Sequence, residues 1–162
     1  ITSSISVPST PKAILFLIIS TVIMFGIVIT YKSPQKFEYP PFKTDVEHVI
    51  MLPSYVPEGY EVTNIDISSA LVLVDYELDG ELLCYVQIFG SSYTLSLDNE
   101  HSTITEYHSD RFDGLLLKDI NIKDSHLLYV LDDDYSYEIF GIIEEEELFK
   151  MIESIEEYVP AK

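Results

Sequence analysis

The stretch LVLVDYELDGELLCYVQIF, residues 71–89, indicates a β-hairpin, because it contains two strand-like runs joined by a tight turn. Both runs are rich in aliphatic and aromatic residues, which favour β-strands. Between them, Asp79 and Gly80 form the residue pair preferred in two-residue hairpin turns. The preceding YEVTNIDI, residues 60–67, alternates apolar and polar side chains. Together these segments predict a three-stranded antiparallel meander.

Further strand signals follow this meander. SSYTLSL (91–97) and STITEYH (102–108) are weaker candidates, because fewer of their residues are apolar. The stronger candidates are GLLLKDINI (114–122), HLLYVLD (126–132) and YSYEIFGI (135–142), with an aspartate-rich turn between the last two. The chain is therefore predicted to form about six to seven antiparallel strands.

The last segment has a helical period. In EEEELFKMIESIEEYV, residues 144–159, one side is apolar and the other acidic, as in an amphipathic helix. The opening run of glutamates lies where the helix dipole favours negative charge. The predicted fold class is therefore α+β, a curved antiparallel sheet with this helix packed on one face. The predicted apolar stripe consists of Leu148, Met151, Ile152, Ile155 and Val159.

A membrane helix is predicted ahead of this domain. AILFLIISTVIMFGIVITY, residues 13–31, contains no charged residue, and as a helix it would be about 28 Å long, close to the thickness of a bilayer core. A cleaved signal peptide is the alternative, but its apolar region is shorter and ends at a small-residue cleavage site. A buried core helix is the other alternative, and it would be shorter or amphipathic. We expect a single retained transmembrane helix at the cell membrane.

The chain accordingly divides into four regions. Residues 1–12 are an N-terminal stump or linker, 13–31 the membrane helix, 32–51 a proline-containing spacer, and 52–162 an acidic domain. More lysines follow the apolar run than precede it, which by the positive-inside rule would place the domain in the cytoplasm. Large domains, however, cross largely regardless of charge. We expect the domain to be extracytoplasmic.

Charge is distributed unevenly along the chain. Residues 1–43 carry a net charge of +3. Because the whole chain has a net charge of −19, the other 119 residues carry −22. Nucleic-acid phosphates are normally neutralised by cationic side chains and would repel such a domain. Nucleic acid is therefore not an expected partner. The negative charge is read as a solvated surface or as complementary to a cationic protein, peptide or metal.

No catalytic constellation stands out, and no cofactor is expected. Nucleophile-elbow, phosphate-loop and zinc-binding motifs are missing from the sequence. Cys84 is the only cysteine and is expected to be buried and inert. Asp132, Asp133 and Asp134 are weak candidates for a hard cation, although their spacing does not match an EF-hand and hairpin-turn solvation is the simpler interpretation. The four histidines are widely spaced: His48, His101, His108 and His126.

The segment LPSYVPEGYEV, residues 52–62, predicts the entry into the first strand of the domain. Pro57 fits the first position of a turn, Gly59 fits a backbone conformation with positive φ, and Tyr60 begins the strand. A structural role is expected here rather than a ligand site.

This entry segment and the C-terminal YSYEIFGIIEEEELFKMIESI together resemble the two ends of a bacterial family, domain of unknown function 4367, over roughly residues 50–156. Two departures are Tyr129, where the family often has tryptophan, and Ile143, where a capping serine is common. The resemblance implies a domain that follows a membrane helix, in some members within anti-sigma-factor-like or lipoprotein-like proteins. It implies no catalytic residues. The matching positions are Leu52, Pro53, Pro57, Glu58, Gly59, Tyr60, Tyr137, Gly141, Glu146, Glu147, Leu148, Ile152, Ser154 and Ile155.

Two functions are therefore considered. The first is a membrane-anchored extracytoplasmic sensing or binding module with a protein or peptide partner, which in one version is the outer part of an anti-sigma-factor-like regulator. The alternative is an envelope-associated hydrolase that uses scattered carboxylates and histidines. Convergent histidine and carboxylate groups in a concave cleft would favour the hydrolase, whereas a filled or flat sheet would favour the binding module.

Overall fold

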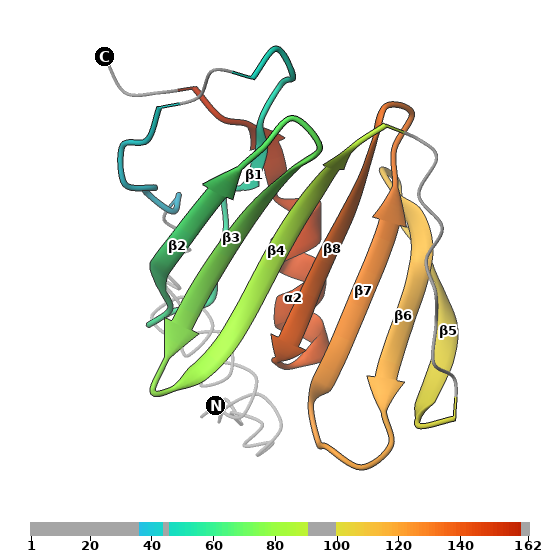
Figure 1. Ribbon diagram of the computed structural model, residues 1–162. Helices are drawn as coiled ribbons and strands as arrows, with labels where there is room; N and C mark the ends of the chain where they lie inside the picture. Colours follow the sequence, from blue (N-terminus) through green and yellow to red (C-terminus); the bar gives the residue numbers. More distant parts are fainter. Residues whose placement is uncertain (1–35, 44–45, 91–99, 160–162) are drawn as a thin grey trace, which may run out of the picture. The chain divides into compact units, whose positions relative to one another are not determined.

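The computed structural model describes residues 36–43, 46–90 and 100–159, all of which belong to one compact unit. Its main element is a seven-stranded antiparallel sheet with the strand order β2-β3-β4-β8-β7-β6-β5 (Figure 1). The strands are β2 (Glu61–Ile67), β3 (Leu71–Leu78), β4 (Glu81–Phe89), β5 (Ser102–His108), β6 (Asp113–Asp119), β7 (Ser125–Leu131) and β8 (Tyr135–Ile142). A helix, α2 (Glu145–Glu153), and a small second sheet of β1 (Met51–Pro53) and β9 (Ile155–Glu157) complete the fold.

Two meanders make up the large sheet. The first runs β2-β3-β4 and the second β5-β6-β7-β8, and the two join where β8 pairs with β4. In this central pair Tyr85 lies opposite Ile139, and Gln87 lies opposite Tyr137. The predicted antiparallel sheet is thereby confirmed. Its strands are sequential neighbours except at the β4–β8 junction.

The predicted turn between β3 and β4 is also present. Asp79 has a φ of 52° and Gly80 a φ of 88°, the pair of positive values that a tight turn of this kind requires. The entry turn before β2 is confirmed as well, because Gly59 has a φ of 92° and the Tyr60 amide donates to the Pro57 carbonyl at 3.3 Å. Local sequence alone specifies both turns.

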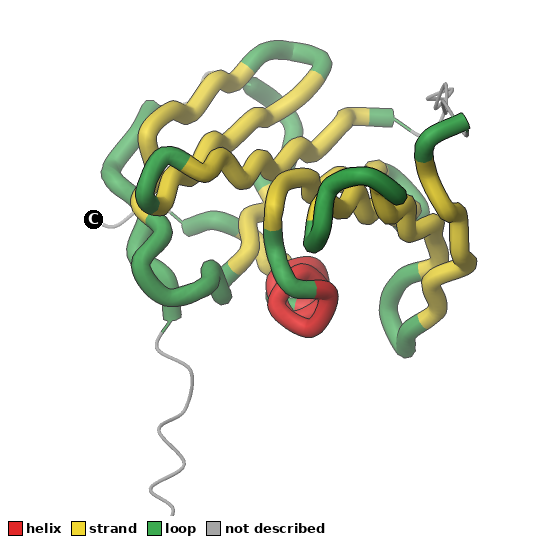
Figure 2. The backbone as a smooth tube through the Cα atoms, turned by 90° about the horizontal axis from the view of Figure 1, so that it is seen from below, coloured by secondary structure: helices red, strands yellow, loops and turns green. Residues whose placement is uncertain are grey.

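The core lies between the sheet and α2. Because successive side chains of a strand point to opposite faces, one set from each strand faces the helix. Figure 2 shows α2 beneath the concave side of the curved sheet. The helix contributes Leu148, Met151 and Ile152, all fully buried, as the sequence predicted. The strand residues of this core are Val72, Val74, Tyr76, Leu83, Tyr85, Tyr107, Leu116, Leu128, Val130, Tyr137 and Ile139.

The helix is shorter than the periodicity predicted. It ends at Glu153, and the chain continues as β9, which pairs with β1. The Arg111 guanidinium donates to the carbonyls of Glu153 at 2.6 Å and Ile155 at 2.9 Å. These hydrogen bonds from another part of the chain satisfy backbone carbonyls where the helix ends. Ile155 remains buried as predicted, but Val159 is 74% exposed and lies outside the stripe.

A second correction concerns β6, which ends at Asp119 rather than continuing to residue 122. The Asp119 carboxylate accepts hydrogen bonds from the amides of Asn121 at 2.7 Å and Ile122 at 3.1 Å. This local turn competes with the strand and leaves the side chain of Ile122 half exposed.

The small sheet is attached to the large one by polar side chains from the core face. Gln87 is fully buried; its Oε1 accepts from the Met51 amide and its Nε2 donates to the Val49 carbonyl, both at 2.9 Å. The Tyr85 hydroxyl donates to the Met51 carbonyl at 2.7 Å. These bonds satisfy backbone groups that β9 does not reach.

Residues 36–43, which fall within the range predicted as a spacer, pack against this part of the core. The Tyr39 hydroxyl contacts the Pro53 carbonyl at 2.8 Å and the Tyr76 hydroxyl at 2.7 Å. Phe42 stacks on Tyr158 with ring centroids 4.4 Å apart. The folded unit therefore begins before residue 52.

The predicted membrane run, residues 13–31, and the predicted strand at 91–97 lie outside the described residues. Within the described ranges, no helix has both the length and the apolar character needed to cross a membrane.

Candidate functional site

The outer sheet face is the side of the seven-stranded sheet turned away from α2. Its apolar side chains are separate from the core cluster, because the sheet itself lies between them. Four of these side chains, at Leu82, Ile104, Leu131 and Ile142, are among the exposed large apolar residues of the chain. The apolar members are Leu71, Leu73, Leu82, Val86, Ile88, Ile104, Leu115, Leu117, Leu127, Tyr129, Leu131, Phe140 and Ile142.

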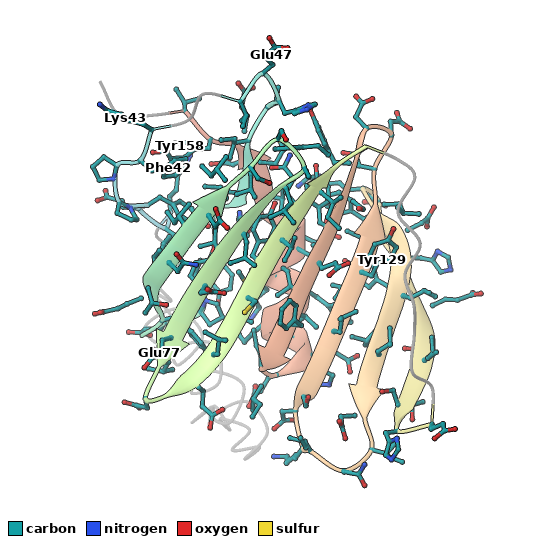
Figure 3. The ribbon with its side chains drawn as sticks, in the orientation of Figure 1. Phe42, Lys43, Glu47, Glu77, Tyr129 and Tyr158 are labelled. Atoms are coloured by element: carbon teal, nitrogen blue, oxygen red, sulfur yellow. The ribbon has the colours of Figure 1, made fainter. Side chains whose placement is uncertain are left out.

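Glu138 lies at the centre of this face. In the strand register it is flanked by Val86 on β4 and by Tyr129 on β7. Figure 3 shows Tyr129 on the side of the sheet opposite α2. The same row continues outward through leucines to an acidic residue at each edge: Asp66, Leu73, Val86, Glu138, Tyr129, Leu115 and Glu106.

The Glu138 carboxylate has no compensating interaction within the described structure. Its Oε1 atom is buried without a hydrogen-bond partner, and burial raises the pKa of this carboxyl group above its ordinary value. The hydroxyl of Ser136, two residues earlier on the same face, is also buried without a partner. Buried polar groups are normally hydrogen-bonded, so two such groups on one apolar face point to an incomplete surface.

The charged side chains of the outer sheet face are carboxylates, apart from His108, which lies between two of them. Its acidic residues are Glu61, Asp66, Asp75, Glu77, Glu106, Asp113, Asp119 and Glu138. No described lysine or arginine lies on it. Lys118 and Arg111 instead contact α2 or the chain that follows it, and Lys150 belongs to α2 itself. The face therefore combines apolar area with negative charge.

The histidines do not converge on one site. His48 stacks on Phe89 with ring centroids 4.3 Å apart, and His126 bonds through Nδ1 to the Ile143 carbonyl at 2.7 Å. His101 is exposed just ahead of β5. Each of these three has a location of its own and none faces another histidine across a cleft.

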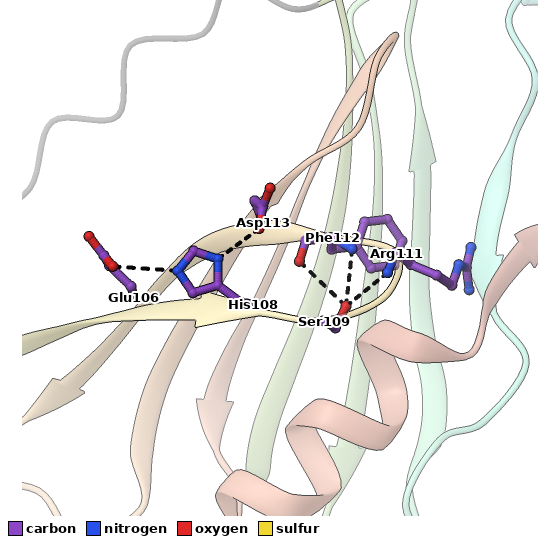
Figure 4. A network of polar contacts seen from close by, with 6 residues as sticks. All are labelled: Glu106, His108, Ser109, Arg111, Phe112 and Asp113. Carbon is purple, nitrogen blue, oxygen red and sulfur yellow. Dashed lines mark hydrogen bonds and ion pairs between the residues drawn. The ribbon is translucent and has the colours of Figure 1, made fainter.

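His108 lies at the end of β5 between two carboxylates, as Figure 4 shows. Its Nδ1 is 2.7 Å from Asp113, and its Nε2 is 3.4 Å from Glu106. The hydrogen bond to Asp113, followed by that to Glu106, raises the pKa of the imidazole. All three side chains are largely exposed, which gives an open ion-pair cluster rather than a catalytic pocket.

The cysteine, Cys84, has a hydrogen-bond partner on the neighbouring strand. Cys84 is buried on the outer sheet face and donates to Asp75 at 3.0 Å; burial, then Asp75, raises its pKa to about 12. Such a thiol is a poor nucleophile at neutral pH.

The weak metal candidates Asp132, Asp133 and Asp134 lie exposed in the β7–β8 turn. The Asp132 carboxylate accepts from the Asp133 amide at 2.7 Å, and the Asp134 carbonyl accepts from the Gly90 amide at 3.1 Å. Across the described ranges, no three or more histidine, cysteine, aspartate or glutamate side chains are grouped to hold a metal ion.

A groove of about 490 Å³ lies beside the small sheet. Its walls are the aromatic rings of Phe37, Tyr39, Phe42 and Tyr158, and Lys36 pairs with Glu156 at its rim. The groove is thus amphipathic, with room for a small apolar group.

The outer sheet face was missed in the sequence, although a signal for it exists. A sheet with one solvated face shows strict alternation, whereas LVLV, LLCYV, LLL and LLYVL are nearly continuous apolar runs. Continuous runs indicate strands that are apolar on both faces. With one short helix available, only one of those faces is covered by described residues.

The comparison with protein-family models gives a match. A family model described as Domain of unknown function (DUF4367) matches residues 50–155, from just before β1 to the start of β9. No curated protein matches the chain at a significant level. The matched range contains the whole outer sheet face, while Phe37, Tyr39, Phe42 and Tyr158 of the groove lie outside it.

Proposed function

The chain belongs to the Domain of unknown function (DUF4367) family, and we propose that it is a membrane-anchored extracytoplasmic binding module. Its role is to recognise a protein or peptide partner rather than to catalyse a reaction. The observation that carries the proposal is the apolar, acidic outer sheet face, which no described element covers.

The geometry supports binding in preference to catalysis. Catalytic sites bring an acid, a base or a nucleophile within hydrogen-bond reach of one another in a cleft. The described histidines are dispersed, the thiol of Cys84 has a raised pKa, and the one His–carboxylate cluster is open to solvent. The alternative of an envelope-associated hydrolase therefore has no observation in its favour within the described residues.

The membrane anchor is proposed from the sequence. Residues 13–31 have the length and composition of a spanning helix, and residues 32–35 then lead into the folded unit. Such an anchor would hold the binding face near the membrane and raise its effective concentration toward partners there. A sensing role, including that of the outer part of an anti-sigma-factor-like regulator, would couple occupancy of the face to this helix.

Protease accessibility of a C-terminal tag in intact bacterial protoplasts tests the proposed location. We expect the tag to be removed without lysis, while a cytoplasmic marker protein stays intact. A tag that is protected until the protoplasts are lysed would contradict the extracytoplasmic placement and would direct the search for partners to the cytoplasm.

A further inference from the structure

No described element covers the outer sheet face, and its side chains indicate what kind of partner would bind there. Thirteen apolar side chains lie on this face, some of them in the row through Glu138, and Leu82, Ile104, Leu131 and Ile142 are at least 38% exposed. Contiguous exposed apolar area of this kind marks interaction surfaces in proteins. The occupant must therefore bring apolar side chains of its own.

The occupant must also bring positive charge. Glu138 is a half-buried carboxylate without a partner, and all the fixed charge around it is negative. A lysine or arginine placed over the face would pair with this carboxylate, and the ring of Tyr129 beside it offers a cation–π contact. A cation would thus offset the free-energy cost of burying the Glu138 carboxylate without a partner.

We propose that the outer sheet face binds a cationic, amphipathic segment of a partner protein, with a lysine or arginine of that segment on Glu138. The segment's apolar side chains cover the leucines, and its other cations meet the acidic residues at the two edges of the sheet, Asp66 on β2 and Glu106 on β5. This inference rests on the proposed function as a binding module and names the chemistry of its partner.

The negative charge of the outer sheet face argues against two other binding partners, a second copy of this chain and an anionic membrane. If a second copy of this chain packed face to face, the Glu138 carboxylates and the acidic edge residues of both copies would share one interface. Like charges in an interface repel each other. An anionic membrane surface would repel the same acidic groups. A cationic protein segment is the occupant that compensates both the apolar area and the charge.

The probe for the test is a twelve-residue peptide of alternating leucine and lysine that carries a photoreactive group. The chain of residues 1–162 is presented in nanodiscs of zwitterionic lipid, and cross-linked positions are mapped by mass spectrometry. We expect cross-links on β4, β7 and β8 at positions of the outer sheet face. A matched peptide of alternating leucine and glutamate is expected to give a yield at least about tenfold lower.

The Glu138→Gln variant tests the central contact, because it keeps the shape of the side chain and removes its charge. We expect the cross-link yield with the leucine–lysine peptide to fall about tenfold. The matched control is Glu144→Gln, which removes an exposed charge ahead of α2 on the other side of the sheet and should leave the yield unchanged. Circular dichroism of both variants checks that the fold is retained.

Several outcomes would overturn the inference. They are equal labelling by both peptides, an unaltered yield in Glu138→Gln, cross-links confined to the groove or to α2, and a concentration-dependent dimer that buries the face. None of these bears on the location of the domain. Conversely, a protected tag in protoplasts would refute the extracytoplasmic function and leave the chemistry of the face intact.

Discussion

Two buried tyrosines differ in how their hydroxyl groups are satisfied. Tyr137 and Tyr85 are both fully buried and face each other across β8 and β4, with ring centroids 6.5 Å apart. The Tyr85 hydroxyl donates to the Met51 carbonyl, whereas the Tyr137 hydroxyl has no partner among the described residues. The same chemical change should therefore have opposite effects at the two positions.

We expect Tyr137→Phe to leave the free energy of unfolding unchanged or to raise it by about 1 kcal/mol, because it removes an unsatisfied buried group. Tyr85→Phe should lower it by about 1–2 kcal/mol, because the Met51 carbonyl loses its donor. Urea denaturation measures both. A greater loss in Tyr137→Phe than in Tyr85→Phe would show that the Tyr137 hydroxyl has a partner after all.

His108 gives a prediction about pH. Asp113 and Glu106 raise the pKa of its imidazole, so the ion pairs stabilise the folded state fully below the unfolded pKa of about 6.5. That contribution is lost as the pH rises through the higher folded pKa. NMR titration of the ring should give a pKa above 6.5. Asp113→Asn should lower it more than Glu106→Gln does, because Asp113 is the closer partner.

The helix is held by its apolar side rather than by its length. α2 has only nine residues, and the side chain of its N-cap residue, Glu144, makes no capping hydrogen bond, so an isolated helix of this kind would not be stable. Ile152→Ala should lower the free energy of unfolding by about 2–5 kcal/mol, since the side chain is fully buried.

The control for this experiment is Val159→Ala. The helical period of the sequence places Val159 on the same stripe, but its side chain is 74% exposed. Its replacement should therefore change the free energy of unfolding by less than about 0.5 kcal/mol. Equal losses in the two variants would mean that the helix continues beyond Glu153.

The sheet also contains a position that only glycine can occupy. A Cβ atom on Gly114 would lie 2.0 Å from the Tyr129 carbonyl oxygen of the adjacent strand. Gly114→Ala should therefore push β6 away from β7 and lower the free energy of unfolding by about 3 kcal/mol, measured by urea denaturation. Gly80→Ala is the comparison: its φ is 88° but nothing lies within 4 Å, so only backbone strain of about 1 kcal/mol is expected. A smaller loss at Gly114 than at Gly80 would contradict this packing.

At the scale of the whole molecule, the folded unit includes residues ahead of the family match. Phe37, Tyr39 and Phe42 pack against the core, and Tyr39 bonds to Pro53 and Tyr76. A chain that begins at residue 46 should be less stable than one that begins at residue 34 by about 2–4 kcal/mol, because it loses this aromatic packing. Thermal denaturation of the two chains measures the difference. Equal melting temperatures would show that the aromatic segment contributes nothing to the fold.

The elements that could be predicted from the sequence are those with local causes. The Asp79–Gly80 turn, the Pro57–Gly59 entry turn and the run of antiparallel strands follow from residue type and period, and the family match follows from the two ends of the domain. These features need only neighbouring residues to form. They therefore leave readable patterns in the chain.

Features that depend on contacts between distant residues could not be predicted and are visible only in the folded structure. Arg111 donates hydrogen bonds to the carbonyls of Glu153 and Ile155, where α2 ends and β9 begins. Gln87 bonds to Met51 of β1 and to Val49 just ahead of it. The outer sheet face was likewise invisible, because Glu138, Val86 and Tyr129 come from three strands and meet only in the register of the folded sheet. Periodicity records which side chains share a face of one element, whereas contacts between elements are set by topology.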